Sequence, residues 1–190
     1  MPDAPVTLHD WQEFLRSYSE DFLRVHSEAE LADFTSTQLA ARWLGYAPAT
    51  EEEVSALEQR LDVQLPPSYR NFLLTSNGWS GAHFAIWELC TTDEAGWLAE
   101  VEAEFLEPWS EYGPADVVEL AERSLLVSCP REGDFWLLDP DTIGPGGEWT
   151  AYSWFSNDGI PPQPYPSFGA LLLNAREEFE SRWRGEAVSY

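Results

Sequence analysis

Side chains that commonly catalyse reactions or bind metals are few in this chain and far apart. The 190 residues include three histidines and two cysteines. His9 and His26 fall on one predicted helix, about four to five turns apart at 3.6 residues per turn, too far to share a metal ion. Zinc sites need closely spaced ligands, and none of the motifs HExxH, CxxC or GxSxG occurs. We therefore expect no metal, no cofactor and no catalytic residue.

Glycine-rich and acidic segments make no better case for an enzyme. Residues 144–148, GPGGE, lack the lysine and the strand-to-helix setting of a phosphate-binding loop. With 34 acidic residues, carboxylate pairs arise by chance and are no evidence for acid–base catalysis. The sequence therefore favours a protein that acts by binding.

The balance of charge is the strongest global signal. The 34 acidic residues stand against 10 basic ones, all arginine, for a net charge of −24. Such a surface repels nucleic acids and anionic membranes, which bind proteins through cationic contacts. It attracts cationic proteins and speeds their encounter. A second explanation is solubility, or a high-GC or salt-adapted source, and composition does not decide between the two.

The acidity is concentrated in a segment that also carries aromatic residues. Residues 88–122 contain eleven acidic residues and no basic one. Aromatic anchors contribute contact energy in interfaces, and carboxylates complement the basic side chains of a cationic partner. The alternative is a solvated acidic helix whose aromatic residues belong to the core, with Trp79 as a lid over a helix pair. The candidate partner-binding residues are Trp79, Trp97, Glu100, Glu104, Glu107, Trp109, Glu111 and Tyr112.

Apolar spacing predicts a helical N-terminal part. A first helix spans residues 8–26, and Asp10 is suited to cap it. Residues 35–38 form a capping box for a short helix that Gly45 would end. We assign residues 1–45 to an N-terminal helical extension.

Two further helices follow in the predicted main domain, residues 46–184. Thr50 and Glu53 form a capping box for the first. Pro67 suits the first position of the second, which Asn77-Gly78 would close. Beyond them the pattern predicts a strand at 83–90, a helix at 94–106, and antiparallel strands at 124–130, 134–140 and 148–155. A hairpin-like turn at 131–133, a stiff linker at 160–166, a last helix opened by Ser167 and a frayed tail at 185–190 complete the prediction.

Targeting signals are not apparent. The N-terminus has neither a basic nor an apolar region typical of a secretory signal, and the longest apolar run is too short to span a bilayer. We expect a cytoplasmic protein. Cys90 and Cys129 each lie in an apolar run and are expected to be buried free thiols, although a single disulfide is an alternative.

The chain resembles the SMI1/KNR4 (SUKH) superfamily, in particular bacterial members of an actinobacterial type. The resemblance begins in WLGYAPATEEEVSALEQRLDVQLPPSYRNFLLTSNGW (43–79) and continues in LLVSCPREGDFWLLDP (125–140), GEWTAYSWF (147–155) and YPSFGALLL (165–173). The chain departs from the family pattern at residues 128–132, SCPRE, where members often carry a small, acidic or glycine-rich turn. The matching residues are Glu53, Glu58, Arg60, Leu61, Leu65, Pro66, Tyr69, Arg70, Asn77, Gly78, Gly133, Asp134, Leu138, Asp139, Ser167 and Phe168.

The resemblance implies an α+β fold, with helices packed on a twisted, mainly antiparallel β-sheet. It also implies a binding module rather than an enzyme. Many bacterial relatives neutralise nuclease or deaminase toxins, whereas fungal relatives are signalling scaffolds, and a shared fold does not identify the partner. By resemblance alone, a ligand pocket would involve Trp87, Asp134, Trp136 and Asp139.

The leading hypothesis is an immunity protein that binds a cationic toxin and covers its active face. One alternative is a regulatory scaffold or general interaction protein. Another is a small-molecule sensor with a pocket lined by Trp79, Trp87 and Trp136. An enzyme ranks last, because the sequence lacks a clustered set of titratable residues.

Overall fold

The computed structural model describes residues 4–129 and 133–183. They form an α+β fold that begins with a helix, which confirms the predicted fold class. The helices are α1 (Leu8–Val25), α2 (Ser36–Ala41), α3 (Glu51–Leu61), α4 (Pro67–Leu73), α5 (Leu98–Val101), α6 (Ala103–Tyr112), α7 (Ala115–Arg123) and α8 (Phe168–Trp183). The strands are β1 (Trp79–Ser80), β2 (Glu88–Leu89), β3 (Gly96–Trp97), β4 (Leu125–Leu126), β5 (Asp134–Ile143), β6 (Trp149–Phe155) and β7 (Gln163–Tyr165).

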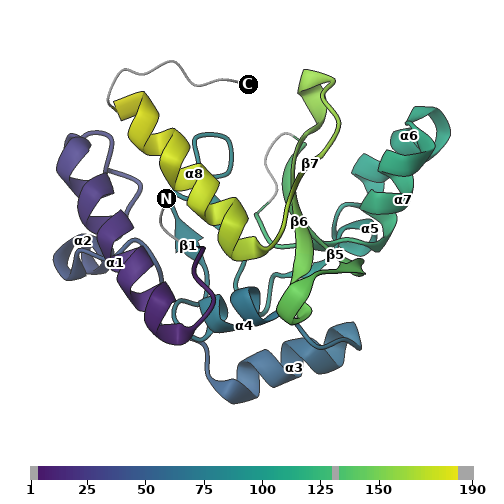
Figure 1. Ribbon diagram of the computed structural model, residues 1–190. Helices are drawn as coiled ribbons and strands as arrows, with labels where there is room; N and C mark the ends of the chain where they lie inside the picture. The colour runs from purple at the N-terminus through teal and green to yellow at the C-terminus, as the bar shows by residue number, and fades with distance from the viewer. Residues whose placement is uncertain (1–3, 130–132, 184–190) are drawn as a thin grey trace.

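A five-stranded antiparallel sheet, in the order β3-β4-β5-β6-β7, lies between two groups of helices (Figure 1). Its longest strand, β5, contains four consecutive buried apolar residues, Phe135 to Leu138. Because successive side chains of a strand point to opposite faces, Phe135 and Leu137 join one core while Trp136 and Leu138 join the other. Both faces of the sheet therefore need a cover.

Helices α1, α3, α4 and α8 contribute to the larger of the two cores. Trp11 of α1 is fully buried, and its indole N–H donates to the Ser68 carbonyl of α4 at 2.8 Å. Buried apolar residues recur at helical spacing along α1, α3 and α8; they are Trp11, Leu15, Tyr18, Phe22, Val54, Leu57, Leu61, Phe168, Leu172 and Ala175.

Helices α5, α6 and α7 cover the opposite face of the sheet (Figure 1). The smaller core beneath them holds Leu106 of α6 and Val117 of α7 against Leu126, Phe135 and Trp154 of the sheet. These three short helices contain most of the acidic segment, residues 88–122. Their inner sides are apolar because they pack against an apolar face of the sheet, which leaves the carboxylates on the outer sides.

Helix α4 receives its N-terminal cap from a distant part of the chain. Its own N-cap residue, Pro66, makes no side-chain capping bond. Glu148, just after the 144–147 turn, accepts hydrogen bonds from the Ser68 amide at 2.9 Å and the Ser68 hydroxyl at 2.6 Å. A carboxylate is favourable there because the N-terminal end of a helix carries partial positive charge. The glycine-rich segment thus positions a structural side chain.

The predicted capping boxes at 35–38 and 50–53 are confirmed, but other helix ends differ from the prediction. Thr7 caps α1, while Asp10 is its capping-box partner inside the helix. Helix α4 ends at Leu73, several residues before Asn77-Gly78.

Gly45 does not end α2 as predicted, because Arg42 already does so in the left-handed conformation. Gly45 instead pairs with Trp79 in an isolated bridge. A Cβ atom at residue 45 would lie 2.0 Å from the Ser76 Oγ atom and 2.7 Å from the Trp79 ring. Glycine is thus required for close packing of this segment.

The predicted strand at 83–90 is mostly loop, and only Glu88–Leu89 forms a strand. The predicted helix at 94–106 is also wrong in part. Gly96–Trp97 pairs with Leu125–Leu126 as β3, and the helix is interrupted at Glu102. Tertiary pairing with the sheet thus overrides a helical apolar pattern.

The strands predicted at 124–130, 134–140 and 148–155 are confirmed as consecutive antiparallel neighbours, although β4 is shorter than predicted and β5 is longer. Helix α7 and strand β7 were not predicted, and β7 lies within the segment expected to be only a stiff linker. The predicted tail 185–190 and residues 131–132 of the predicted turn lie outside the described residues.

A buried ion pair connects α7 to β5. Asp139 is fully buried, and its carboxylate accepts bonds from Arg123 Nε at 2.8 Å and Nη2 at 3.0 Å. The Thr142 hydroxyl and the Asp141 amide also donate to this carboxylate. Asp139 is therefore a structural residue that fastens the α5–α7 layer to the sheet.

We expect Arg123→Gln to lower the free energy of unfolding by about 2 kcal/mol, because it leaves the buried Asp139 charge without its ionic partner. The partial exposure of Arg123 keeps the loss below that of a fully buried pair. Urea unfolding measures this loss in the free energy of unfolding. Arg24→Gln is the matched control, because it removes an exposed pair with Asp21 and should cost less than about 0.5 kcal/mol.

The same pair predicts a dependence of stability on pH. Burial raises the pKa of Asp139, but the bonds from Arg123, Thr142 and the Asp141 amide outweigh it, so the pKa lies below its ordinary value of 3.8. A lowered folded-state pKa stabilises the fold above the ordinary value, and this contribution is lost as the pH falls through the folded-state pKa. The stability difference between wild type and Arg123→Gln should therefore shrink below about pH 4. A difference that stays constant in urea unfolding at lower pH would contradict this assignment.

Candidate functional site

A surface groove lies where α6 meets α7 and faces the segment between β6 and β7. We call it the α6 groove. Its volume is about 490 Å³, and no charged side chain lines it. Its lining residues are Pro108, Trp109, Tyr112, Gly113, Pro114, Val117, Trp154, Ser156, Gly159, Ile160, Pro161 and Pro162.

The sheet and the end of α6 hold the aromatic residues of this groove in place. Trp109 packs edge-on against Trp154 of β6, with ring centroids 4.9 Å apart and planes at 78°. Helix α6 ends at Tyr112, and a Cβ atom on the following Gly113 would lie 2.8 Å from the Trp109 ring. Glycine at this position therefore lets the chain turn tightly beside the tryptophan.

Tyr112 is the most exposed aromatic residue of the groove, at 79% exposure. Its hydroxyl bonds to Glu111, which raises the pKa of Tyr112. A large apolar ring so exposed beside a groove is typical of a contact residue. Ile160, on the facing segment, is also exposed.

The two helices that form the α6 groove also carry exposed carboxylates outside its lining, which we call the acidic rim. Glu104, Glu107 and Glu111 are exposed on α6, and Asp116 is exposed at the start of α7. In the part of the chain that the structure describes, none of these four pairs with a basic side chain, and the nearby Arg123 binds Asp139. An apolar floor with an unneutralised acidic rim suits a basic partner that presents an apolar side chain.

The structure brings together only some of the predicted contact residues. Trp109, Glu104, Glu107, Glu111 and Tyr112 share α6, and Glu100 is exposed on the neighbouring α5.

Two predicted aromatic anchors do not belong to the α6 groove. Trp79 is completely buried and cannot contact a partner, so that expectation was wrong. Trp97 is half-buried and packs against the larger core, on the other side of the sheet from Trp109. Its position on β3, rather than on a helix with the glutamates, explains the difference.

Sequence reasoning missed the half of the groove contributed by β6 and the segment after it. Trp154 and Ile160 lie far from α6 in the chain and reach it only through the fold of the sheet. The proline pair at 161–162 was a visible signal, because it marks a stiff segment, but nothing local indicated which helix it would face.

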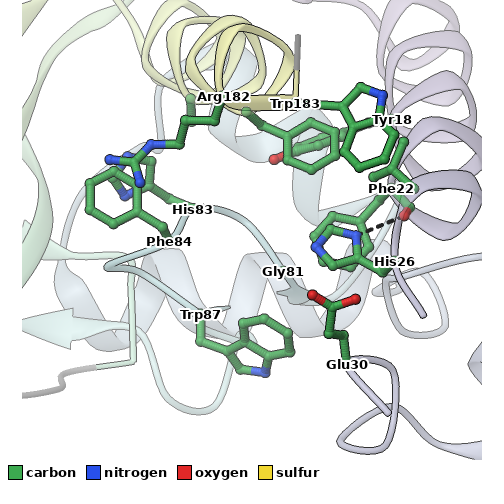
Figure 2. Close-up of a pocket in the computed structure, with 13 residues that line it drawn as sticks. Tyr18, Phe22, His26, Glu30, Gly81, His83, Phe84, Trp87, Arg182 and Trp183 are labelled. Carbon is green, nitrogen blue, oxygen red and sulfur yellow. Dashed lines mark hydrogen bonds between the residues drawn. The ribbon is translucent and has the colours of Figure 1, made fainter. Parts of the chain in front are cut away.

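Two further hollows lie on the other side of the sheet and share His83. One, which we call the α1–α8 hollow, has a volume of about 410 Å³ and includes Trp87 (Figure 2). The other has a volume of about 190 Å³ and includes Trp136. Two residues of the pocket predicted by resemblance therefore line neighbouring hollows. Asp134 and Asp139 line neither of these two hollows, and Asp139 is buried in its ion pair with Arg123.

His83 lines both hollows and forms a hydrogen-bonded pair with Glu178, which lines the smaller one. The Glu178 carboxylate lies 2.9 Å from His83 Nε2, and Asn174 also donates to Glu178 at 2.7 Å. The His83 bond, together with the Asn174 bond, holds the pKa of Glu178 below its ordinary value despite partial burial. Because His83 Nδ1 accepts from the Ala85 amide, Nε2 carries the proton that is donated to Glu178. Both hydrogen-bonding positions of the imidazole are thus occupied by structural partners.

Other predicted features can be checked within residues 4–129 and 133–183. No group of three or more histidine, cysteine, aspartate or glutamate side chains there is arranged to hold a metal ion. None of the described helices has both the length and the apolarity to cross a bilayer. Cys90 and Cys129 form no disulfide in the described residues; Cys90 is buried as predicted, whereas Cys129 is only partly buried. A hydrogen bond with Cys129, together with burial, raises the pKa of Cys90.

Comparison with known proteins gives a single family. The model of the SMI1 / KNR4 family (SUKH-1) matches residues 48–174. A search of curated proteins finds no match to the chain. The matched range runs from just before α3 into α8, so it includes the capped α3, the α4 elbow, the whole sheet and the α6 groove. Because the match extends over well more than half of the sequence, this chain belongs to the SMI1/KNR4 family (SUKH-1).

Proposed function

We propose that this chain is a cytoplasmic immunity protein that binds a cationic nuclease or deaminase toxin and covers its active face, without catalysing a reaction. Membership of the SMI1/KNR4 family supports a protein-binding module of the immunity type. The observation that carries the proposal is the α6 groove, with its apolar floor, its exposed Tyr112 and its acidic rim.

The floor and the rim of the groove have separate roles in this proposal. Buried aromatic contacts supply most of the binding energy of an interface, so Trp109 and Tyr112 would receive an apolar side chain of the toxin. The exposed carboxylates of α6 would meet arginine and lysine residues around that side chain and accelerate the encounter. The net charge of −24 strengthens this attraction at long range.

The immunity protein would cover the active face because the toxin binds its own substrate through a cationic surface. A nuclease or a deaminase that acts on nucleic acid must present a cationic surface to the phosphate backbone. The carboxylates of α6 and α7 offer regular negative charge to that same surface. A bound immunity protein would therefore exclude the substrate by occupying its place, with no catalytic group required.

Tyr112→Ala should weaken binding of the toxin about ten- to thirtyfold, because it removes an exposed anchor worth about 1.4–2 kcal/mol. The experiment captures basic proteins from a lysate of the source organism and measures the affinity of the recovered protein by biolayer interferometry. Thermal unfolding should not change, because Tyr112 is exposed.

Phe84→Ala is the matched control for this measurement, since Phe84 is also an exposed ring but lies outside the α6 groove. Equal affinities of the Tyr112 variant and wild type would exclude the groove as the contact. An effect of Phe84→Ala alone would move the interface to the other side of the sheet.

Neutralising the rim should mainly slow association. The triple variant Glu104→Gln, Glu107→Gln and Glu111→Gln should reduce the association rate on the order of tenfold at low salt and flatten its dependence on ionic strength. Stopped-flow or biolayer measurements over a range of salt concentrations test this.

A control for net charge carries Glu20→Gln, Glu28→Gln and Glu52→Gln, three exposed acids elsewhere on the molecule. It has the same total charge as the rim variant and should associate nearly as fast as wild type. If both triple variants slow equally, the attraction belongs to the whole molecule and not to the α6 rim.

A further inference from the structure

The α1–α8 hollow is a second candidate binding site, independent of the α6 groove. It lies between the C-terminal halves of α1 and α8 and the loop that contains residues 81–87 (Figure 2). Its volume of about 410 Å³ is within the range of small-molecule pockets. The two sites share no lining residue and lie on opposite sides of the sheet.

The walls of the hollow are mostly aromatic rings, several of them parallel. Phe22 stacks on His26 at 4.0 Å with planes at 18°, and Phe179 stacks on Phe22 at 5.4 Å with planes at 20°. On the other walls, Phe84 and Trp183 are 55% and 60% exposed. Large rings that remain exposed around one hollow are an unusual cost for a soluble protein, and a ligand with a flat apolar part would cover them.

Two charged side chains stand on different sides of these walls (Figure 2). The Glu30 carboxylate is directed toward the hollow, near His26. One of its oxygens accepts bonds from the Ser27 amide and the Ser27 hydroxyl, each at 2.8 Å. These bonds hold the pKa of Glu30 below its ordinary value, so the carboxylate is ionised at neutral pH.

Arg182 occupies the side nearer to Phe84 and His83. Its guanidinium carbon lies 3.6 Å from the centre of the Phe84 ring, a cation–π contact. The wall thus already holds one planar cation against an aromatic face. A second positive group would be repelled from this side and attracted to the side of Glu30.

We propose that the α1–α8 hollow binds a small molecule composed of a planar aromatic ring and a positively charged amine, with the ring among the aromatic walls and the amine beside Glu30. The strongly negative charge of the whole molecule also favours a cationic ligand over an anionic one. The inference does not depend on the identity of any protein partner of the α6 groove.

Three probes with one ring system and different charges test the proposal: tryptamine, which is cationic, indole, which is neutral, and indole-3-propionate, which is anionic. Isothermal titration calorimetry should rank tryptamine first, about tenfold tighter than indole, and indole-3-propionate last. Saturable binding should shift the indole N–H resonances of Trp87 and Trp183 and leave those of Trp109 and Trp154 in place.

Glu30→Gln should remove the advantage of tryptamine over indole and leave the affinity for indole unchanged. Glu28→Gln is the matched control, because Glu28 is an exposed acid two positions away that does not line the hollow. The proposal is overturned if tryptamine shows no saturable binding, if it shifts Trp109 instead of Trp87, or if Glu30→Gln leaves the ranking intact. If Glu30→Gln and Glu28→Gln weaken tryptamine binding equally, the preference for tryptamine arises from the net charge of the whole protein, and the proposal is likewise overturned.

Discussion

The rest of the structure depends on a strand that is apolar on both faces. Four consecutive buried side chains, Phe135 to Leu138, leave β5 with no side that can face water. Burying a large apolar side chain is worth about 1.5–3 kcal/mol, so a layer of helices on each face is strongly favoured. One layer contains α1, α3, α4 and α8, and the other contains α5, α6 and α7. The second layer contains most of the acidic segment, residues 88–122, and exposes its carboxylates on the outer side.

The acidic surface is thus a product of how its helices pack. Each short helix of the second layer turns an apolar residue such as Leu106 or Val117 toward the sheet. The carboxylates then have only the outer side left, and no basic residue between positions 88 and 122 lies beside them in the chain. The layer that covers this face of the sheet therefore presents its carboxylates to solvent, where a basic partner could reach them.

Local signals in the sequence predicted much of the fold. Thr50 with Glu53 forms a capping box within one turn, and such short-range patterns do not depend on tertiary context. Helix α7 was missed because its N-cap is Pro114, which makes no side-chain capping bond, and β7 was missed because prolines surround it. At the site, α6 supplied the predictable part, whereas Trp154 reaches the groove through pairing of strands that no local pattern specifies.

The cap of α4 has a consequence for the order of folding. Glu148 lies 80 residues after Ser68, so a ribosome releases the two prolines and the whole helix long before their carboxylate partner exists. In the nascent chain the N-terminal end of α4 stays uncapped until Glu148, which lies between β5 and β6, has been synthesised. The Ser68 carbonyl also accepts the Trp11 indole N–H, so this one residue joins α1, α4 and the segment before β6. Chain termination before residue 148 would therefore leave the N-terminal end of α4 without its carboxylate cap.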